Sequence, residues 1–486
     1  MTTNLEHRHP GQPNPDHELS RRRRITVLLI CCMSLLIVGM DNTIVNVALP
    51  SIGREFHASV AGLQWTIDAY VVVLASLLML SGSMADRFGR RRIFQLGLVI
   101  FTLASFLCSR APSLEWLVAF RILQAVGGSM LNPVAMSIIR NTFEDPRERA
   151  QAIGVWGAVV GVSLALGPVI GGVLVQTVGW RAIFLVNLPV GVAAIVLTAC
   201  FVPESRAPQP RRIDPVGQVL VILILGSLTY AIIEGPGHGW ASPEIVGLLV
   251  VFAVSLLSLL WYEPRRREPL IDLRFFRSTP FSGATVIAVA AFAAFSGFLF
   301  LNTLYLQDVR GLSALDAGLI TLPMAAMTMI VSPLAGALVG RRGARIPLMS
   351  AGVALTLGSV MLVGLTDTTS YEWLVASYLI FGIGFGLVNP PITNTAVSGM
   401  PPAQAGVAAA VASTSRQVGQ ALGVAVIGVA ATAGLNGQLG HGLAKSSHPG
   451  WWIVVACSAS VLVLGYLSTT PRAYRSAARI QPLFES

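Results

Sequence analysis

The sequence predicts an all-α integral membrane protein with fourteen transmembrane helices, built as two six-helix transporter halves plus two inserted central helices. Three observations predict this class. Apolar runs of roughly 20 residues, the length that spans a bilayer, recur along the whole chain. Basic residues gather in all but one of the alternate connections between these runs, and a pattern from the first third of the chain returns in the last third. With 54% hydrophobic and only 12% charged residues, the 486-residue chain is unlike a soluble globular protein.

The apolar runs fix the expected spans. They lie near residues 25–50, 61–82, 93–110, 114–139, 150–177, 182–202, 214–234, 244–262, 280–306, 316–340, 346–366, 371–397, 405–434 and 451–469. Lys and Arg are retained on the cytoplasmic side of membranes, so their distribution tests this arrangement. Of the 33 basic residues, 26 lie in segments expected to be cytoplasmic and five lie in external loops. We therefore expect a multi-pass protein of a bacterial plasma (inner) membrane with both termini in the cytoplasm.

The spans divide the chain into five regions. They are a disordered basic cytoplasmic tail (1–24), an N-terminal six-helix half (25–202), a linker with two inserted helices (203–279), a C-terminal six-helix half (280–469) and a cytoplasmic tail (470–486). The net charge of +10 follows from the loops that orient the spans, so no nucleic acid partner is expected. The five cysteines all fall in apolar runs without metal-ligand spacing, so neither a disulfide framework nor a metal site is expected.

An internal repeat relates the two halves. Asn132-Pro133 in the fourth span returns as Asn389-Pro390 in the twelfth, 257 positions later, with glycines before both. The Ala-Gln-Ala run at 150–152 likewise returns at 403–405, at the start of the thirteenth span. Parallel repeats of this kind are a known plan of transporters, with the substrate site between the halves.

The connection between the second and third spans carries a specific pattern. It contains Gly82, Asp86, Arg87, Gly89 and Arg90, followed by two further arginines. An ordinary cytoplasmic loop explains the arginines, but it does not explain the spacing of the glycines around the aspartate. The pattern resembles the signature loop of the major facilitator superfamily, and this resemblance implies a loop that takes part in the conformational switch of transport.

Three ionisable residues lie inside the spans of the N-terminal half at about the same depth. Asp41, Asp68 and Arg121 are each expected about 10–13 Å from the external surface, at a rise of 1.5 Å per residue. Charged groups inside a bilayer are costly, so they indicate a proton carrier or a static ion pair that fixes the packing of helices. We expect proton coupling, with Asp41 as the principal group because its neighbours are the most apolar.

Three further runs resemble motifs of the fourteen-helix drug:proton antiporter branch of that superfamily. The runs are Gly39–Pro50, Gln64–Tyr70 and a glycine motif in the fifth span. The resemblance assigns Arg121 to proton coupling, and it places the glycine motif between the halves of antiporters. The motif comprises Gly157, Gly161, Gly167, Pro168, Gly171 and Gly172. The alternative for these glycines is ordinary close packing of helices.

Polar side chains within the spans are candidates for a substrate cavity. They are Asn46, Trp65, Asn132, Asn302, Tyr305, Asn389 and Arg416. For each of them, a hydrogen bond between neighbouring helices is an equally good interpretation. The central parts of the C-terminal spans contain no Asp or Glu, which argues against strongly dicationic substrates.

Together these features predict a proton-coupled antiporter that exports amphiphilic small molecules such as antibiotics and dyes. It would act as a monomer, with protons and small-molecule substrates as its partners and no cofactor beyond the proton gradient. A dedicated exporter of one endogenous metabolite or lipid is the alternative. A polytopic membrane enzyme or sensor is a weaker one, because no P-loop, His-x-x-His pattern or long soluble segment is present.

Overall fold

The computed structural model describes residues 20–207, 213–266, 268–398, 400, 404–433 and 442–480. Within these ranges every regular element is helical, which confirms the predicted all-α class. The N-half comprises α1 (Arg21–Phe56), α2 (Val60–Phe88), α3 (Arg90–Ser109), α4 (Leu114–Ser129), α5 (Asn132–Thr142), α6 (Pro146–Thr177), α7 (Ala182–Leu185) and α8 (Asn187–Phe201). The inserted pair is α9 (Pro215–His238) and α10 (Pro243–Tyr262).

Two short 3-10 helices, η2 (Glu263–Arg265) and η3 (Leu273–Arg277), lead into the C-half. The C-half comprises α11 (Thr279–Leu304), its one-turn π-helical end η4 (Tyr305–Val309), α12 (Ala314–Arg342), α13 (Arg345–Val363), α14 (Tyr371–Val397), α15 (Ala405–Thr432), α16 (Leu443–Ser446) and α17 (His448–Ser468). A further helix, α18 (Pro471–Ile480), follows the last span, inside the region expected as a tail.

Thirteen helices in the described ranges are long and apolar enough to cross a bilayer. They occupy thirteen of the fourteen predicted positions. The remaining position, 405–434, is occupied by the 28-residue helix α15. Arg416, Gln417 and Gln420 near the middle of α15 make it more polar than the other spans. The fold therefore agrees with the predicted fourteen-helix class.

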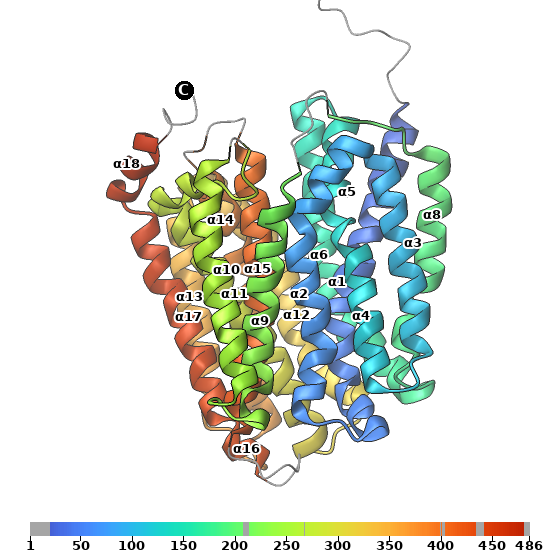
Figure 1. The fold of residues 1–486 in the computed structure, drawn as a ribbon. Helices are drawn as coiled ribbons and strands as arrows, with labels where there is room; N and C mark the ends of the chain where they lie inside the picture. Colours follow the sequence, from blue (N-terminus) through green and yellow to red (C-terminus); the bar gives the residue numbers. More distant parts are fainter. Residues whose placement is uncertain are drawn as a thin grey trace, which may run out of the picture.

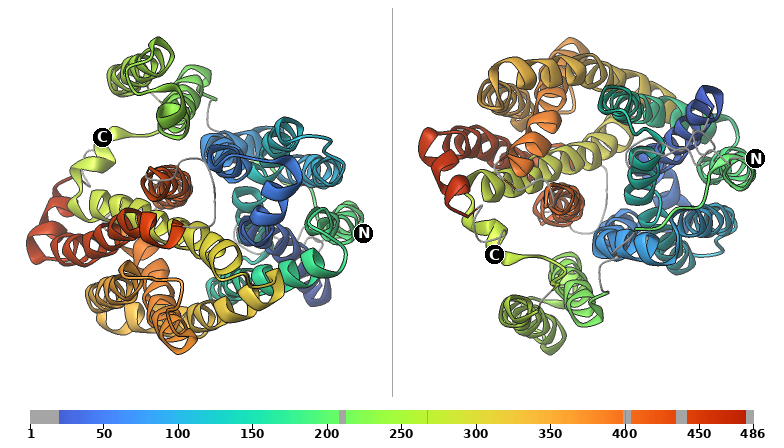
Figure 2. Two further views of the ribbon diagram at one scale, coloured as in Figure 1. Left: turned by 90° about the horizontal axis from the view of Figure 1, so that it is seen from below. Right: turned by 90° about the horizontal axis from the view of Figure 1, so that it is seen from above.

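The helices form two bundles side by side, with the inserted pair at the edge between them. Figure 2 shows the N-half, drawn from blue to cyan-green, beside the C-half, drawn from yellow to red. α9 packs against α10, against α2 of the N-half and against α15 of the C-half. The side-chain amide of Gln218 on α9 donates to the carbonyl of Ser76 on α2 at 2.7 Å, which ties the inserted pair to the N-half.

The two halves meet most closely at one end of the bundle. We call the end where α1 begins and α17 ends the terminal face, and the other end the opposite face (Figure 1). Towards the opposite face, α6 packs along α12 and α2 packs along α15. Gln307 Nε2 in η4 donates to the carbonyl of Val47 on α1 at 2.9 Å. The Gln64 amide on α2 donates to the carbonyls of Val424 and Ala425 on α15 at 2.8 and 2.9 Å.

Two local features differ from the expected boundaries. The first helix begins at Arg21, not at residue 25, because the Ser20 side chain caps it by accepting from the backbone N–H of Arg23. Residues 21–24 are therefore helical and do not belong to a disordered tail, whereas residues 1–19 lie outside the described part. The fourth span is broken between α4 and α5, where Pro133 removes a backbone donor and crowds the preceding turn.

Candidate functional site

A buried ion pair joins the first and fourth helices of the N-half. The Arg121 guanidinium on α4 donates to the Asp41 carboxylate on α1, and both side chains are almost completely inaccessible to water. Gln124 Nε2 donates to Asp41 Oδ1 at 2.9 Å, and Asn187 Nδ2 on α8 donates to the same oxygen at 3.3 Å. The Asp41 carboxylate is thus surrounded by hydrogen-bond donors, which compensate for its lost hydration.

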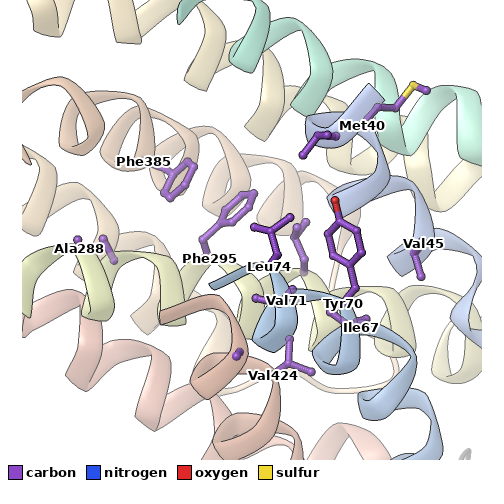
Figure 3. Close-up of a cluster of buried hydrophobic side chains, with 14 of the residues drawn as sticks. Met40, Val45, Ile67, Tyr70, Val71, Leu74, Ala288, Phe295, Phe385 and Val424 are labelled. Atoms are coloured by element: carbon purple, nitrogen blue, oxygen red, sulfur yellow. The ribbon is translucent and has the colours of Figure 1, made fainter. Parts of the chain in front are cut away.

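The arginine of this pair is held from several sides. Arg121 Nε donates to the backbone carbonyl of Thr66 on α2 at 3.1 Å, and one terminal nitrogen also donates to Gln124 Oε1 at 2.7 Å. Its guanidinium lies 4.1 Å from the centre of the Tyr70 ring, a distance that allows a cation–π interaction. Figure 3 shows Tyr70 among the apolar residues between the halves. A proton on Asp41 would therefore disturb contacts among α1, α2, α4 and α8.

Asp68 lies apart from this network, although its expected depth was the same. Its side chain is completely buried, and neither carboxyl oxygen has a hydrogen-bond partner. Asp68 follows Gln64 by four residues, so the two share the face of α2 that the Gln64 hydrogen bonds direct towards α15. An ionised carboxylate without partners is costly to bury, so this position between the halves suits a protonated carboxyl group.

The C-half contains an uncharged counterpart of the Asp41–Arg121 pair. Tyr378 on α14 stands 257 positions after Arg121, the same offset that relates the two Asn-Pro pairs. Its hydroxyl donates to Asn302 Oδ1 on α11, and both side chains are buried. Each half therefore links its first and fourth helices through a polar pair, but only the N-half pair contains a carboxyl group.

The signature loop is bound to the chain segment that follows α8. Arg90 donates to Asp86 Oδ1 from two nitrogens, at 3.1 and 2.9 Å. The backbone carbonyl of Asp86 accepts from Ala207 at 3.1 Å, and the N–H of Arg90 donates to the carbonyl of Ser205 at 2.9 Å. Gly89 has a φ of 117°, and a Cβ there would lie 2.7 Å from Glu204 Oε1, so both conformation and space require glycine.

The remaining loop residues differ in their surroundings. Arg87 is exposed and its guanidinium lies 5.9 Å from the Phe88 ring centre. A Cβ at Gly82 would lie no closer than 4.0 Å to its nearest neighbour, Pro133, so this glycine is not needed for close packing in this conformation.

Most of the glycine motif lies where α6 meets α1 and α12. A Cβ on Gly172 would lie 2.7 Å from the Leu315 Cα of α12, and one on Gly161 would lie 3.2 Å from the Met329 Cα. Gly171 packs in the same way against Ile44 of α1. A Cβ on Gly167 would collide with Thr43, and the carbonyl of Pro168 is crowded against Gly318 of α12. Gly157 is the exception, because no atom lies within 4 Å of its Cβ position.

The candidate cavity residues fall into two groups. Asn46 and Asn302 line a small pocket between the halves towards the opposite face, together with Thr43, Gln307 and Thr321. Trp65 does not face that pocket. Its indole N–H donates to Glu234 Oε1 on α9 at 2.7 Å and its ring lies beside Tyr230, so it links α2 to the inserted pair.

Tyr305 is likewise engaged outside the pocket. Its hydroxyl donates to the carbonyl of Thr366 at 2.7 Å and accepts from Arg310 at 3.2 Å. Asn132 and Asn389 are partly exposed, and the side-chain oxygen of each has no hydrogen-bond partner. Arg416 donates to the Thr393 hydroxyl. These last three residues remain candidates for contact with a substrate.

Two residues of the Asp41 network had not been expected. Gln124 lies three residues after Arg121 and therefore on the same helical face, which is the signal that would have indicated it. Asn187 lies at the first turn of α8, and nothing in the sequence pattern places it beside Asp41. Within the described ranges, no three His, Cys, Asp or Glu side chains come together as a set that could hold a metal ion.

Comparison with known proteins identifies relatives over most of the chain. A family model described as Major Facilitator Superfamily matches residues 31–424. The chain is 38% identical to the "Multidrug resistance protein Stp" of Mycobacterium tuberculosis, covering 86% of this chain and 78% of that protein. It is 36% identical to the "Tetracenomycin C resistance and export protein" of Streptomyces glaucescens, covering 84% and 76%. It is 34% identical to the "Multidrug efflux pump LfrA" of Mycolicibacterium smegmatis, covering 85% and 81%.

The fold also matches a solved structure. A bacterial homologue of the human lysosomal transporter Spinster, in an inward-facing and occupied conformation, superposes with a TM-score of 0.66 at 18% identity. The match covers 95% of this chain and 98% of that one. At this identity the likeness supports the fold alone.

Proposed function

The chain belongs to the Major Facilitator Superfamily, and on that premise we propose that it exports amphiphilic small molecules, antibiotics and dyes among them, in exchange for protons. It is a multi-pass membrane transporter, and its described residues contain thirteen helices long and apolar enough to cross a bilayer together with the more polar helix α15. Export is supported by the relatives above, which are named for drug resistance and efflux. Exchange for protons is supported by the buried ionisable residues of the N-half.

We further propose that the terminal face is cytoplasmic and that the protein works in a bacterial plasma membrane. The basic signature loop and the arginines of α18 lie at the terminal face, as the rule for cytoplasmic loops requires. The connection before α11, with Arg265, Arg266, Arg274 and Arg277, lies at the same face. With this orientation the close contacts of α6 with α12 and of α2 with α15 lie towards the outside. The described conformation is then closed outside, and transport requires these contacts to open.

The observation that carries the proposal is the Asp41–Arg121 network. An ion pair in the membrane interior is stable when the two charges and the surrounding hydrogen-bond donors compensate for the lost hydration. Neutralising one of the two charges leaves the other buried without compensation. A proton that reaches Asp41 would release Arg121 towards Tyr70 and Gln124, and would loosen the contact between α1 and α4. This is a two-state element that a proton gradient can bias.

Asp68 supplies the second element of the proposed cycle. The sequence favoured Asp41 as the principal proton carrier, but in the described conformation Asp41 is paired and Asp68 is not. We therefore assign to Asp68 the proton that the outward-closed conformation holds. Deprotonation would make that burial unfavourable and would favour separation of α2 from α15.

A dedicated exporter remains the second candidate. One relative is named for resistance to and export of a single compound, tetracenomycin C, while others are named as multidrug proteins. A panel of chemically unrelated compounds distinguishes the two. Export of one compound class alone would favour the dedicated function.

Reconstitution in liposomes tests the proposal. When a proton gradient is imposed across the liposome membrane, the purified protein should move ethidium against its concentration gradient. Protons should cross the membrane in the opposite direction as ethidium moves. Asp41→Asn and Asp68→Asn should each abolish uphill transport, because neither can exchange a proton. Asp367→Asn, at an exposed acid between α13 and α14, is the matched control and should behave like the wild type. Uphill transport by both Asp41→Asn and Asp68→Asn would refute proton coupling through these residues.

A further inference from the structure

Arg416 is a cation without an anionic partner in the middle of the C-half. It stands near the centre of α15, and its guanidinium donates to the neutral hydroxyl of Thr393 on α14. Nε has no hydrogen-bond partner, and no ion pair with Arg416 is present in the described part of the chain. A guanidinium offers five N–H donors and does not lose its charge in proteins, so most of this binding capacity is unused.

The acidic residues of the spans do not supply a partner. In the C-half, Asp308, Asp316 and Glu372 lie at helix ends on the opposite face. In the N-half, Asp41 is already paired with Arg121. Asp68 lies on α2 one turn after Gln64, which bonds Val424 and Ala425 of α15, but neither of its carboxyl oxygens has a hydrogen-bond partner, so it is not paired with Arg416. Unpaired charges in a membrane interior are rare and mark substrate or ion pathways. The missing partner is therefore best sought in a ligand.

Polar atoms without partners line the helix faces around Arg416. Asn389 precedes Thr393 by one helical turn on α14, and Gln420 follows Arg416 by one turn on α15. The side-chain oxygens of Asn389, Gln417 and Gln420 all lack hydrogen-bond partners. Arg416, Thr393 and Asn389 are partly exposed side chains of the neighbouring helices α14 and α15.

An aromatic cluster completes the surroundings. The Phe292 ring of α11 lies 6.0 Å from the Arg416 guanidinium and 5.2 Å, edge to face, from Phe385. Phe385 stacks on Phe295 with ring centres 4.1 Å apart. Figure 3 shows the two side chains beside each other. Phe385 also precedes Asn389 by one turn, so one face of α14 runs from an aromatic to a polar character. This is the arrangement that suits an amphiphile with an aromatic body and a charged head.

We propose that Arg416 binds the anionic group of the transported compound, and that the substrate class includes aromatic organic acids. The guanidinium fork matches a carboxylate or sulfonate in two parallel hydrogen bonds, and the Thr393 hydroxyl, which accepts from Arg416, can donate its own proton to the same anionic group. The Phe292–Phe385–Phe295 cluster would receive the aromatic body. This inference rests on the proposed export function and specifies the chemistry of its substrates.

A pair of dyes that differ by one charge tests the inference. 1-Anilinonaphthalene-8-sulfonate and N-phenyl-1-naphthylamine share one skeleton, and only the first carries a sulfonate. Binding of the two tritiated dyes to bead-bound protein would be measured by scintillation proximity. The wild type should bind the sulfonate about tenfold or more tightly than the amine, the difference expected for hydrogen bonds to a charged group. Arg416→Gln should lose that advantage and still bind the amine.

Two further variants provide the controls. Arg416→Lys keeps the charge and should retain part of the preference for the sulfonate. Arg110→Gln removes an exposed arginine between α3 and α4 and should leave both affinities unchanged. Equal binding of both dyes by the wild type would overturn the inference. So would an Arg416→Gln variant that keeps the sulfonate preference, or one that loses both dyes alike, which would indicate a purely structural role.

The proposed function can fail separately. If the wild type exports ethidium in a pH gradient but shows no preference for the sulfonate, only the anion site is refuted. If the dyes bind as expected but no compound of the panel is exported, the site stands as a binding site and the export function is refuted.

Discussion

Replacement of Asp68 by asparagine should remove the pH dependence of closure at the opposite face. The Asp68 carboxyl is completely buried and its oxygens have no partners, so its ionised form opposes this conformation. A charged side chain in a membrane interior costs at least about 2.5–3.5 kcal/mol. At 1.36 kcal/mol for each factor of ten, ionisation should lower the closed-to-open ratio about 100-fold. Asparagine has almost the same shape and cannot ionise, so the variant should stay closed at every pH.

Pairs of spin labels across the halves measure this equilibrium. Val178, after α6, and Asp367, between α13 and α14, are exposed at the opposite face on different halves. Cysteines at these positions, in a background without the five native cysteines, would carry the labels. In the wild type the long-distance population should grow as pH rises. In the Asp68→Asn background the short-distance population should dominate throughout.

The result that would refute this reasoning is an unchanged pH response in Asp68→Asn. Asp308 serves as the control, because it pairs with Arg54 across the halves at 3.7 Å on the same face. Its ionised form attracts Arg54 and so stabilises closure, which is the reverse of the effect expected for Asp68. Asp308→Asn should therefore weaken closure at high pH, where the wild-type pair is intact. The two variants thus move the equilibrium in opposite directions.

Three further predictions concern other parts of the transporter. Gly172→Ala should block closure and transport, because the new Cβ would lie 2.7 Å from the Leu315 backbone. Gly157→Ala should transport normally, because no atom lies within 4 Å of its Cβ position. Ethidium efflux from cells measures the difference between the two variants. Asp86→Asn keeps an oxygen that can accept from Arg90 but removes the negative charge of this half-buried pair, so it should slow efflux several-fold. Membrane insertion should be normal, because the arginines of the loop remain. Reporter fusions within 235–243 should be external, and a cytoplasmic reporter there would contradict the topology.

The number and order of spans could be predicted because membrane insertion depends on composition. Apolar runs and arginine-rich connections are properties of single segments, and they located thirteen apolar helices and α15 within a few residues. Arg121 and Asp41 could also be expected at one depth from their distance to the helix ends. That they form a pair, while Asp68 at similar depth does not, depends on which way each helix faces.

The residues that could not be predicted lie where the neighbouring helix is unknown from sequence. Trp65 is an aromatic residue in a motif-bearing span, so a cavity position was reasonable. Its actual partners, Glu234 and Tyr230, belong to the inserted pair, whose position beside α2 is not encoded in any local pattern. Gly157 belongs to the same motif as Gly172, but only the second meets α12. The spacing of residues predicts which of them share a helix face, but it does not predict which other helix packs against that face.

The uncharged Tyr378–Asn302 pair limits the substrate concentration ratio that proton exchange can maintain. If transport is coupled to protons as proposed, each proton entering is driven by the membrane potential, and 100 mV supplies about 2.3 kcal/mol per charge. That energy sustains about a fiftyfold concentration ratio of a neutral substrate. The C-half contributes no carboxyl group to proton exchange. The second half therefore adds helices to the protein but adds no further exchanged proton to drive transport. The steepest gradient that the transporter can maintain would then be decided by Asp41 and Asp68 alone.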